Sequence, residues 1–222
     1  MPPIAGVANA AMVLEDTTIM DMSLDVMTKV LRPKVDGSQY LNELFQEDTL
    51  DFFIMFSSLA TIFGNHGQSA YTTANMFMNG LATERRSRGL AGSVIAIAAL
   101  LGIGYTAREV SKELLERIRQ GGYAMMSERD IHQLFAEAVL VGRPENGPTF
   151  EIITGLRIVK QGETVAAGWF TNPMFQHVVL RQGGLDTSVA DSVSSKLPLK
   201  TQIFTARSED EVREMIQGRS NL

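Results

Sequence analysis

The 222-residue sequence contains no cysteine, which excludes a disulfide framework, a thiolate nucleophile and a zinc–thiolate site. The three histidines, His66, His132 and His177, are not spaced as metal ligands are, so we expect no metal site. The longest apolar run covers residues 94–103, contains a glycine and is too short to cross a bilayer. A buried strand explains this run better than a membrane span.

The sequence also has little net charge and no visible targeting signal. Hydrophobic residues make up 45% and charged residues 20%, which is typical of a folded globular chain. The net charge of -5 gives no reason to expect nucleic acid or an anionic membrane as partner. No basic segment precedes an apolar core near Met1, so we expect no signal peptide and a cytoplasmic location.

Apolar runs alternate with segments of helical periodicity along the first 155 residues. The runs predict strands over residues 4–8, 50–56, 93–100 and 150–153, and the periodic segments predict helices over residues 24–45 with a break at Pro33, 68–88, 108–119 and 127–139. Strands that alternate with helices in this way predict a parallel sheet with right-handed crossovers.

The composition changes after residue 155. Residues 183–184 and 188–195 are small and polar, as in a linker. Residues 208–211 then predict the start of a short helix that ends at Gly218. We therefore predict a main domain over residues 1–155, followed by a linker and a short helix over residues 156–222.

Three polar residues stand at positions suited to carbonyl chemistry. Ser58 ends an apolar run, Tyr71 follows 13 residues later near the start of a helix, and Asn75 lies one turn further on. A hydroxyl acid, a second hydroxyl and an amide beside a strand end suit protonation of a carbonyl oxygen during hydride transfer. Taken singly, such a serine is usually a cap and such a tyrosine usually packs in a core, so the prediction rests on their joint spacing.

The spacing of Ser58 and Tyr71, the Gly64-x-x-Gly67-Gln68 run and the Tyr71-x-x-Ala74-Asn75 block resemble those of polyketide synthase ketoreductases, which belong to the short-chain dehydrogenase/reductase superfamily. Residues 31–37 and 51–78 look most like fungal highly reducing synthases, including those fused to peptide synthetases. The resemblance covers residues 2–155. It implies a three-layer α/β/α fold, with a partial doubly wound Rossmann-like parallel sheet that holds strands 4 to 7 of the usual seven.

The resemblance implies NADPH as cofactor and a role for each polar residue. Tyr71 would protonate the nascent alkoxide and Ser58 would polarise the carbonyl. Lys34, 24 residues before Ser58, would lower the pKa of Tyr71 and orient the cofactor ribose. Most short-chain reductases carry this lysine four residues after the tyrosine. Asn75 holds that position here and would bind a water or the lysine, an exchange typical of the polyketide branch.

The opening residues resemble the fourth strand of these reductases and the loop beyond it. Asn9 and Ala10 would contact the cofactor together with Lys34 and Tyr71. Met12 stands where the family usually has glycine. By the same resemblance, these residues line the place of the nicotinamide ribose.

Two positions bear on the stereochemistry that the resemblance implies. Leu14-Glu15-Asp16 keeps the second acid of the family's Leu-Asp-Asp motif, and Phe63 lies eight residues before Tyr71, where other members have tryptophan. The only tryptophan, Trp169, is far downstream. Asp16 and Phe63 therefore predict a D-3-hydroxyacyl product, and residues 105–123 would form the substrate lid.

The sequence contains no Gly-x-Gly-x-x-Gly loop to place a pyrophosphate at a helix N-terminus, and Gly102-Ile103-Gly104 lacks the third glycine. We therefore expect the 222-residue chain alone to bind NADPH weakly or not at all and to lack turnover. Strand 4–8 would be an exposed apolar edge, which pairs with the missing nucleotide-binding half or self-associates.

The implied function is NADPH-dependent reduction of a 3-oxoacyl chain, tethered by phosphopantetheine to an acyl carrier protein domain, within a larger synthase. Residues 1–155 would be the catalytic half of the ketoreductase. One alternative is a non-catalytic fragment that docks a carrier protein or a partner subunit. Another is a short-chain enzyme that uses the same hydroxyls for epimerisation or dehydration. The intact set of Lys34, Ser58, Tyr71 and Asn75 favours the reductase.

Overall fold

The computed structural model describes residues 3–47, 50–102, 104, 110–121, 123–157, 159–160, 169 and 172–180. The chain divides into two compact units, Met1–Val179 and Leu180–Leu222. The sheet and all the predicted site residues belong to the first unit. The predicted linker at 183–195 and the helix ending at Gly218 lie outside the described residues.

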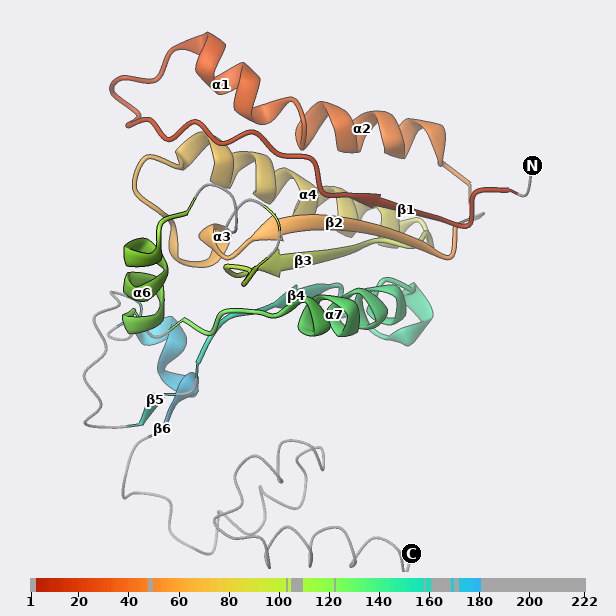
Figure 1. Cartoon of the computed structure of the whole chain (residues 1–222). Helices are drawn as coiled ribbons and strands as arrows, with labels where there is room; N and C mark the ends of the chain where they lie inside the picture. The colour runs from red at the N-terminus through yellow and green to blue at the C-terminus, as the bar shows by residue number, and fades with distance from the viewer. Residues whose placement is uncertain are drawn as a thin grey trace, which may run out of the picture. The chain divides into compact units, whose positions relative to one another are not determined.

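The first unit is built on a parallel sheet of β1 (Gly6–Asn9), β2 (Phe52–Ser58), β3 (Ser93–Ile97) and β4 (Glu151–Ile153), in the order β1-β2-β3-β4 (Figure 1). Val7 lies opposite Phe53, and Met55 lies opposite Val94. The prediction of a parallel sheet from alternating elements is confirmed. The third strand is shorter than predicted, because beyond Ile97 only Leu100 makes an isolated bridge, to Met126.

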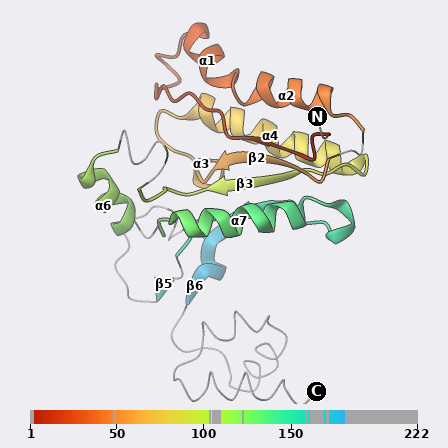
Figure 2. The same cartoon turned by 45° about the vertical axis from the view of Figure 1, so that its right-hand side comes forward.

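Helices cover both faces of this sheet, as Figures 1 and 2 show. On one face lie α1 (Leu24–Leu31), α2 (Val35–Leu44) and α4 (Ser69–Ser87), with α4 against β2 and β3. On the other face α7 (Glu128–Val141) packs against β2, β3 and β4. The partial doubly wound, three-layer α/β/α fold is therefore confirmed.

The alternation of side chains along β2 explains why both faces are covered. Phe53 and Met55 point to the α4 side, where they pack with Met78. Ile54 points to the α7 side, where it packs with Ile95. Because successive strand residues face opposite ways, a strand that is apolar throughout must be buried on both sides.

Local signals set the helix boundaries. Ser23 caps α1 by accepting a hydrogen bond from Val26 N, and the predicted break at Pro33 separates α1 from α2. Ser127 and Asp130 form the predicted capping box of α7. The remaining elements are α3 (Ala60–Phe63), α6 (Lys112–Gln120), η1 (Pro144–Asn146), β5 (Val159–Lys160), η3 (Pro173–Val178) and β6 (Val179–Leu180), of which only α6 was predicted.

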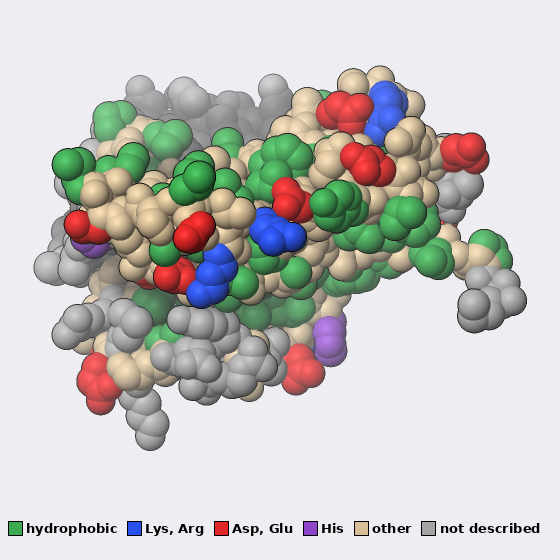
Figure 3. Space-filling view, turned by 90° about the horizontal axis from the view of Figure 1, so that it is seen from above, with side chains coloured by type: hydrophobic (Ala, Val, Ile, Leu, Met, Phe, Trp, Pro, Cys, Tyr) green, Lys and Arg blue, Asp and Glu red, His purple; other side chains and the backbone are tan. Residues whose placement is uncertain are grey.

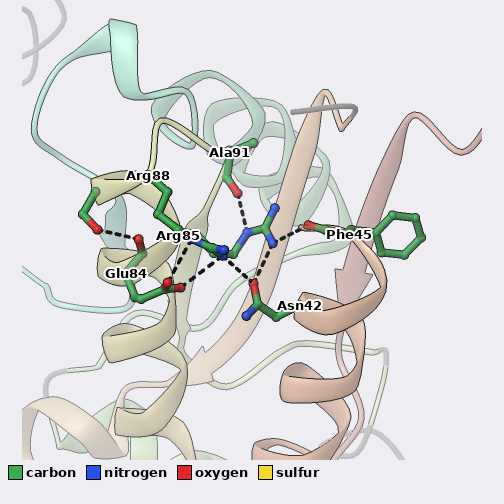
Figure 4. A network of polar contacts seen from close by, with 7 residues as sticks. Asn42, Phe45, Glu84, Arg85, Arg88 and Ala91 are labelled. Atoms are coloured by element: carbon green, nitrogen blue, oxygen red, sulfur yellow. Dashed lines mark hydrogen bonds and ion pairs between the residues drawn. The ribbon is translucent and has the colours of Figure 1, made fainter. Parts of the chain in front are cut away.

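Arg85, near the end of α4, is fully buried and ties three segments together (Figure 4). Its Nε donates to Ala91 O at 2.8 Å, and its Nη1 donates to Asn42 Oδ1 at 2.8 Å and to Phe45 O at 2.9 Å. The guanidinium also lies 4.0 Å from the centre of the Phe53 ring. Burial, and then the charge of Arg88, lower the pKa of Arg85 to about 10, so it stays charged at neutral pH.

Apolar side chains are exposed on the outer surface of α1 and α2. Leu24 is 78% exposed, Tyr40 60% and Leu44 74%. Figure 3 shows hydrophobic side chains on this face interspersed with acidic and basic ones. Among the described residues, no helix is both long enough and apolar enough to cross a membrane.

Strand β1 forms one end of the sheet, as predicted, because β2 is its single partner among the described residues. Ile4, just before the strand, is 59% exposed. The outer edge of β1 therefore presents unpaired backbone groups, the feature that in other sheets invites a further strand.

Candidate active site

The predicted site residues gather at the carboxyl ends of β1 and β2. Asn9 ends β1 and Ser58 ends β2. Lys34 immediately precedes α2, and Tyr71 lies in the first turn of α4. In open α/β sheets ligands bind at this edge, outside the carboxyl ends of the strands. The fold therefore brings together residues that lie more than 60 positions apart, from Asn9 to Tyr71.

Lys34 is buried beside the tyrosine. Its side chain is 2% exposed, its Nζ donates to Phe56 O at 2.6 Å, and Nζ lies 5.6 Å from the centre of the Tyr71 ring. Burial lowers the pKa of Lys34 to about 8, because desolvation disfavours the charged ammonium. The lysine therefore remains mostly protonated at neutral pH and holds a positive charge next to the phenol.

Tyr71 is 8% exposed, and its hydroxyl lies 4.0 Å from the sulfur of Met12. Burial raises the pKa of Tyr71, hydrogen bonding with Asn75 and Ser58 acts in the opposite direction, and the Asp16 carboxylate adds to the rise. In this structure the Tyr71 pKa is thus above its ordinary value. The phenol is protonated at neutral pH, as a proton donor must be. A lowering of this pKa by Lys34 stays a prediction.

Asn75 lies one helical turn after Tyr71 and is fully buried. Its Nδ2 donates to the Tyr71 backbone oxygen at 2.7 Å, whereas its Oδ1 has no hydrogen-bond partner among the described residues. A buried carbonyl oxygen without a partner is costly, so it favours an arriving donor. This suits the predicted role of Asn75, which is to hold a water or the lysine.

Ser58 is placed by the turn between β2 and α3. Its Oγ accepts a hydrogen bond from Ala60 N at 3.2 Å, a local turn contact that holds the hydroxyl beside the first residue of α3. Because that bond uses an acceptor lone pair, the O–H remains able to donate. A donor at this strand end suits the predicted polarisation of a carbonyl oxygen.

Residues 1–102 match the family described as KR domain. Over 216 residues, which are 97% of the chain, the sequence is 45% identical to the hybrid PKS-NRPS synthetase mycA of Thermothelomyces thermophilus. The chain belongs to the ketoreductase (KR) family.

Further relatives agree with this assignment. The hybrid PKS-NRPS synthetase poxE of Penicillium oxalicum is 47% identical over 218 residues. The chain covers 5% of the length of each of these two relatives. A solved A-type ketoreductase of a modular polyketide synthase is 28% identical, with a TM-score of 0.59, over 70% of this chain and 31% of that one. The first ketoreductase of the tylosin synthase is 27% identical, with a TM-score of 0.56, over 88% of this chain and 39% of that one.

In this ketoreductase chain the Asn9 side chain connects segments around the site through hydrogen bonds. The Asn9 Nδ2 donates to Ser38 Oγ at 2.9 Å and to Pro33 O at 3.3 Å, and its Oδ1 accepts from Ala11 N at 3.1 Å. The side chain thus links the end of β1 to the break between α1 and α2, next to Lys34. Ala10 lies exposed beside it. Contact of Asn9 and Ala10 with a cofactor stays a prediction.

The loop after β1 is clamped to the loop before α4. The Gln68 Nε2 donates to both Asp16 carboxylate oxygens at 3.1 Å, and Thr17 N donates to Gly67 O at 2.8 Å. Glu15 pairs with Lys29 at 2.7 Å. The acid predicted to govern stereochemistry is therefore held by the residue that opens the Tyr71 helix, and its stereochemical role stays a prediction.

Sequence patterns missed one group of residues near the ketoreductase site. Phe63, in α3, lies 5.4 Å from Tyr123, 6.3 Å from Trp169 and 5.2 Å from Phe175, between ring centres. These four residues are called the aromatic cluster below. The contact between Trp169 and Phe63 was not predicted, because the two residues lie 106 positions apart and their spacing carries no signal for a contact.

Met12 also belongs to the site, because its sulfur lies against the Tyr71 hydroxyl. Met12 stands where the family usually has glycine, and this departure was the sequence signal that could have predicted the contact. Within the described part of the chain, no group of three or more histidine, aspartate and glutamate side chains is arranged to hold a metal ion.

Proposed function

We propose that the chain supplies the catalytic residues for NADPH-dependent reduction of a carrier-tethered 3-oxoacyl chain to its 3-hydroxyacyl form, as part of a larger polyketide synthase. The observation that carries this proposal is the packing of the buried Lys34 ammonium beside Tyr71, with Asn75 bonded to the Tyr71 backbone oxygen one helical turn away. Epimerisation or dehydration would use the same hydroxyls without net oxidation of NADPH, so an assay of NADPH oxidation separates them from reduction.

Each residue has a distinct task in this reaction. Tyr71, protonated at neutral pH, gives its proton to the oxygen that becomes the hydroxyl. The O–H of Ser58 hydrogen-bonds the same oxygen and stabilises the negative charge that develops on it. Lys34 compensates the phenolate left behind, because its charge lies next to the Tyr71 ring.

The residues present fit one part of the cofactor. Lys34 is a buried cation whose Nζ contacts Phe56 O, and its remaining N–H groups suit the hydroxyls of a ribose. Lys34 and Tyr71, with the Asn9–Ala10 turn, would hold the nicotinamide ribose. NADPH supplies the hydride when it is bound. The sequence has no glycine-rich loop for the phosphates, so these would be held by residues outside the 222.

The absence of that loop from the sequence gives a direct test with the 222-residue chain. Calorimetry should detect weak NADPH binding or none, and the chain alone should not oxidise NADPH. Sedimentation should show either self-association through β1 or pairing with an added nucleotide-binding half. Tight, stoichiometric NADPH binding by the monomeric chain would contradict this part of the proposal.

The stereochemical part of the proposal concerns Asp16 and Phe63. By family resemblance they favour the D-3-hydroxyacyl product, since Asp16 keeps one acid of the motif and Phe63 replaces the tryptophan. Chiral chromatography of the product from a 3-oxoacyl thioester measures this directly, and an L-configured product would overturn it.

The decisive experiment is Tyr71→Phe in a complete ketoreductase, made by joining the chain to the nucleotide-binding half of a relative. NADPH oxidation with a simple 3-oxoacyl thioester should fall about 10²- to 10⁴-fold, because the general acid is lost. Tyr40→Phe is the matched control, since Tyr40 lies on α2 and is 60% exposed. Undiminished turnover by Tyr71→Phe would refute the assignment of Tyr71 as proton donor, whereas no turnover by the wild-type complete protein would favour a docking module.

A further inference from the structure

The aromatic cluster joins three parts of the chain that are far apart in sequence. Phe63 comes from α3, Tyr123 follows α6, and Trp169 and Phe175 come from the segment after β4. Trp169 and Phe175 are each 3% exposed. Trp169 is central, because its ring lies 6.3 Å from Phe63, 6.3 Å from Tyr123 and 5.9 Å from Phe175.

Trp169 holds the end of α6. Its indole Nε1 donates to Gly121 O at 3.3 Å, directly after the last residue of the helix. Gly121 is buried, and a Cβ there would lie 3.1 Å from the Tyr123 ring, so the exit from α6 is tightly packed against the cluster. The next residues are fixed as well, because Ala124 N donates to Gly155 O at 2.9 Å.

The same cluster reaches the catalytic serine through Phe63. Phe63 is the last residue of α3, and the first backbone N–H of that helix is bound by Ser58 Oγ. The helix has a single turn, so displacement of Phe63 acts directly on the residues that follow Ser58. Ile62, its neighbour, packs against Trp169 and Phe175 too.

We propose that Trp169 is a positioning residue for the substrate side of the site, which holds the exit of α6 and the α3 turn in a fixed relation to each other. The inference rests on the proposed function, in which Ser58 contacts the substrate carbonyl. It assigns Trp169 to the working site, although it lies after the last strand of the parallel sheet. Tyr71 and Trp169 belong to different hydrophobic clusters, so we expect cofactor binding to be insensitive to Trp169.

Trp169→Phe tests this in the complete ketoreductase, because phenylalanine keeps an aromatic ring but removes the indole N–H. We expect the KM for the 3-oxoacyl thioester to rise about threefold to tenfold, as for loss of one hydrogen bond. The kcat and the KM for NADPH should stay within about twofold. A residue with a purely structural role would instead lower the amount of folded enzyme and leave both KM values unchanged.

Phe175→Leu is the matched control. It removes a ring of the cluster and lowers the melting temperature through a cavity, but it leaves the bond from Trp169 Nε1 to Gly121 O. Its thioester KM should stay within about twofold of the wild type. A similar rise of KM in both variants would overturn the role of the indole N–H.

Absence of 3-oxoacyl thioester reduction by the complete protein would refute the proposed function alone. Amide hydrogen exchange still tests the role of Trp169 in that case, because it does not depend on activity. Amides of residues 112–121 should exchange about threefold to tenfold faster in Trp169→Phe, and not in Phe175→Leu. Unchanged exchange in Trp169→Phe, or equal acceleration in both variants, would overturn the inference.

Discussion

The two sides of the ketoreductase site are built in different ways. On the side of α4, Lys34, Tyr71 and Asn75 form a buried polar group whose members contact one another or nearby backbone. On the side of α3 and α6, ring packing joins Phe63 to Trp169, and Trp169 Nε1 donates to Gly121 O. The polar side is thus suited to proton transfer, and the aromatic side to shaping access.

The polar side and the aromatic side also contribute differently to the free energy of unfolding. Buried polar groups lower the free energy of unfolding unless they are paired, so we expect the residues of the polar side to destabilise the fold. Aromatic packing stabilises the fold and is sensitive to volume rather than to charge. Substitutions on the two sides should therefore change activity and stability in different proportions.

The largest expected effect is on the polar side. Lys34→Met in the complete ketoreductase should lower kcat/KM about 10²- to 10⁴-fold, because the charge beside Tyr71 is lost. The initial rate of NADPH oxidation measures this. Lys29→Met is the control, since Lys29 is exposed and, within the described part of the chain, pairs with Glu15 alone. Equal losses in the two variants would show that the effect is not specific to the buried ammonium.

Substitution of Arg85 tests whether the stability of the α4 side can be lowered while kcat stays unchanged. Arg85→Met leaves the backbone oxygens of Phe45 and Ala91 without their Arg85 donor and Asn42 Oδ1 with Arg88 as donor, so the free energy of unfolding should fall by about 2–4 kcal/mol. Arg88→Met removes a partly exposed ion pair with Glu84 and a 3.2 Å hydrogen bond to Asn42 Oδ1, and should cost about 1 kcal/mol. Denaturant unfolding measures both, and the kcat of folded Arg85→Met should be unchanged. A large fall of kcat at full folding would contradict the separation.

The pKa of Lys34 makes the polar side sensitive to pH. This pKa is about 8 in the folded chain against 10.5 for the ordinary group, so above pH 8 the unfolded chain binds more protons than the folded one. The free energy of unfolding contributed by Lys34 therefore rises with pH, by about 1–3 kcal/mol between pH 8 and the ordinary value. Below about pH 8 the buried charge is present in the folded state and is destabilising.

Lys34→Met isolates this contribution. The variant should be more stable than the wild type at about pH 7, and the difference should shrink towards about pH 9.5, in unfolding measured by denaturant. The measurements end at about pH 9.5 because burial also raises the pKa of Tyr71 above its ordinary value of 10. Above pH 10 the phenol loses its proton more readily in the unfolded chain, so Tyr71 then lowers the free energy of unfolding. A difference that is constant with pH would show that Lys34 is not desolvated as the structure has it.

The sequence predicted the parallel sheet and the polar side because both have local signals. Apolar runs such as Leu50 to Phe56 mark buried strands, Pro33 marks the break between α1 and α2, and Ser127 with Asp130 marks a capped helix. Ser58, Tyr71 and Asn75 lie within one strand-turn-helix unit, so their spacing survives folding almost unchanged.

The aromatic cluster and the α3 turn had no such signal. The Ala60–Phe63 helix is too short for a periodic pattern to show, and the cluster contact of Phe63 with Trp169 depends on how the segment after β4 returns to the sheet. The contact between Met12 and Tyr71 is also tertiary, since it requires the Gln68–Asp16 clamp that holds the intervening loop.

The smallest expected effect tests the aromatic side alone. Trp169 is the only tryptophan of the chain and is 3% exposed, so its fluorescence reports on the aromatic cluster without interference. Phe63→Leu removes the ring that stacks on it at 6.3 Å and should lower the free energy of unfolding by about 1 kcal/mol. It should also shift the Trp169 emission to longer wavelength, because the indole becomes more accessible to water.

Phe135→Leu is the matched control, since Phe135 packs against Phe52 at 5.4 Å on the α7 face, outside the aromatic cluster. Its stability loss should be similar, while the Trp169 emission should not move. If the aromatic and polar sides are independent, Phe63→Leu should also leave the pH dependence of stability that comes from Lys34 unchanged, because their ring and ammonium share no contact. An altered pH dependence in Phe63→Leu would show that the two sides are coupled, and the comparison between them would then fail.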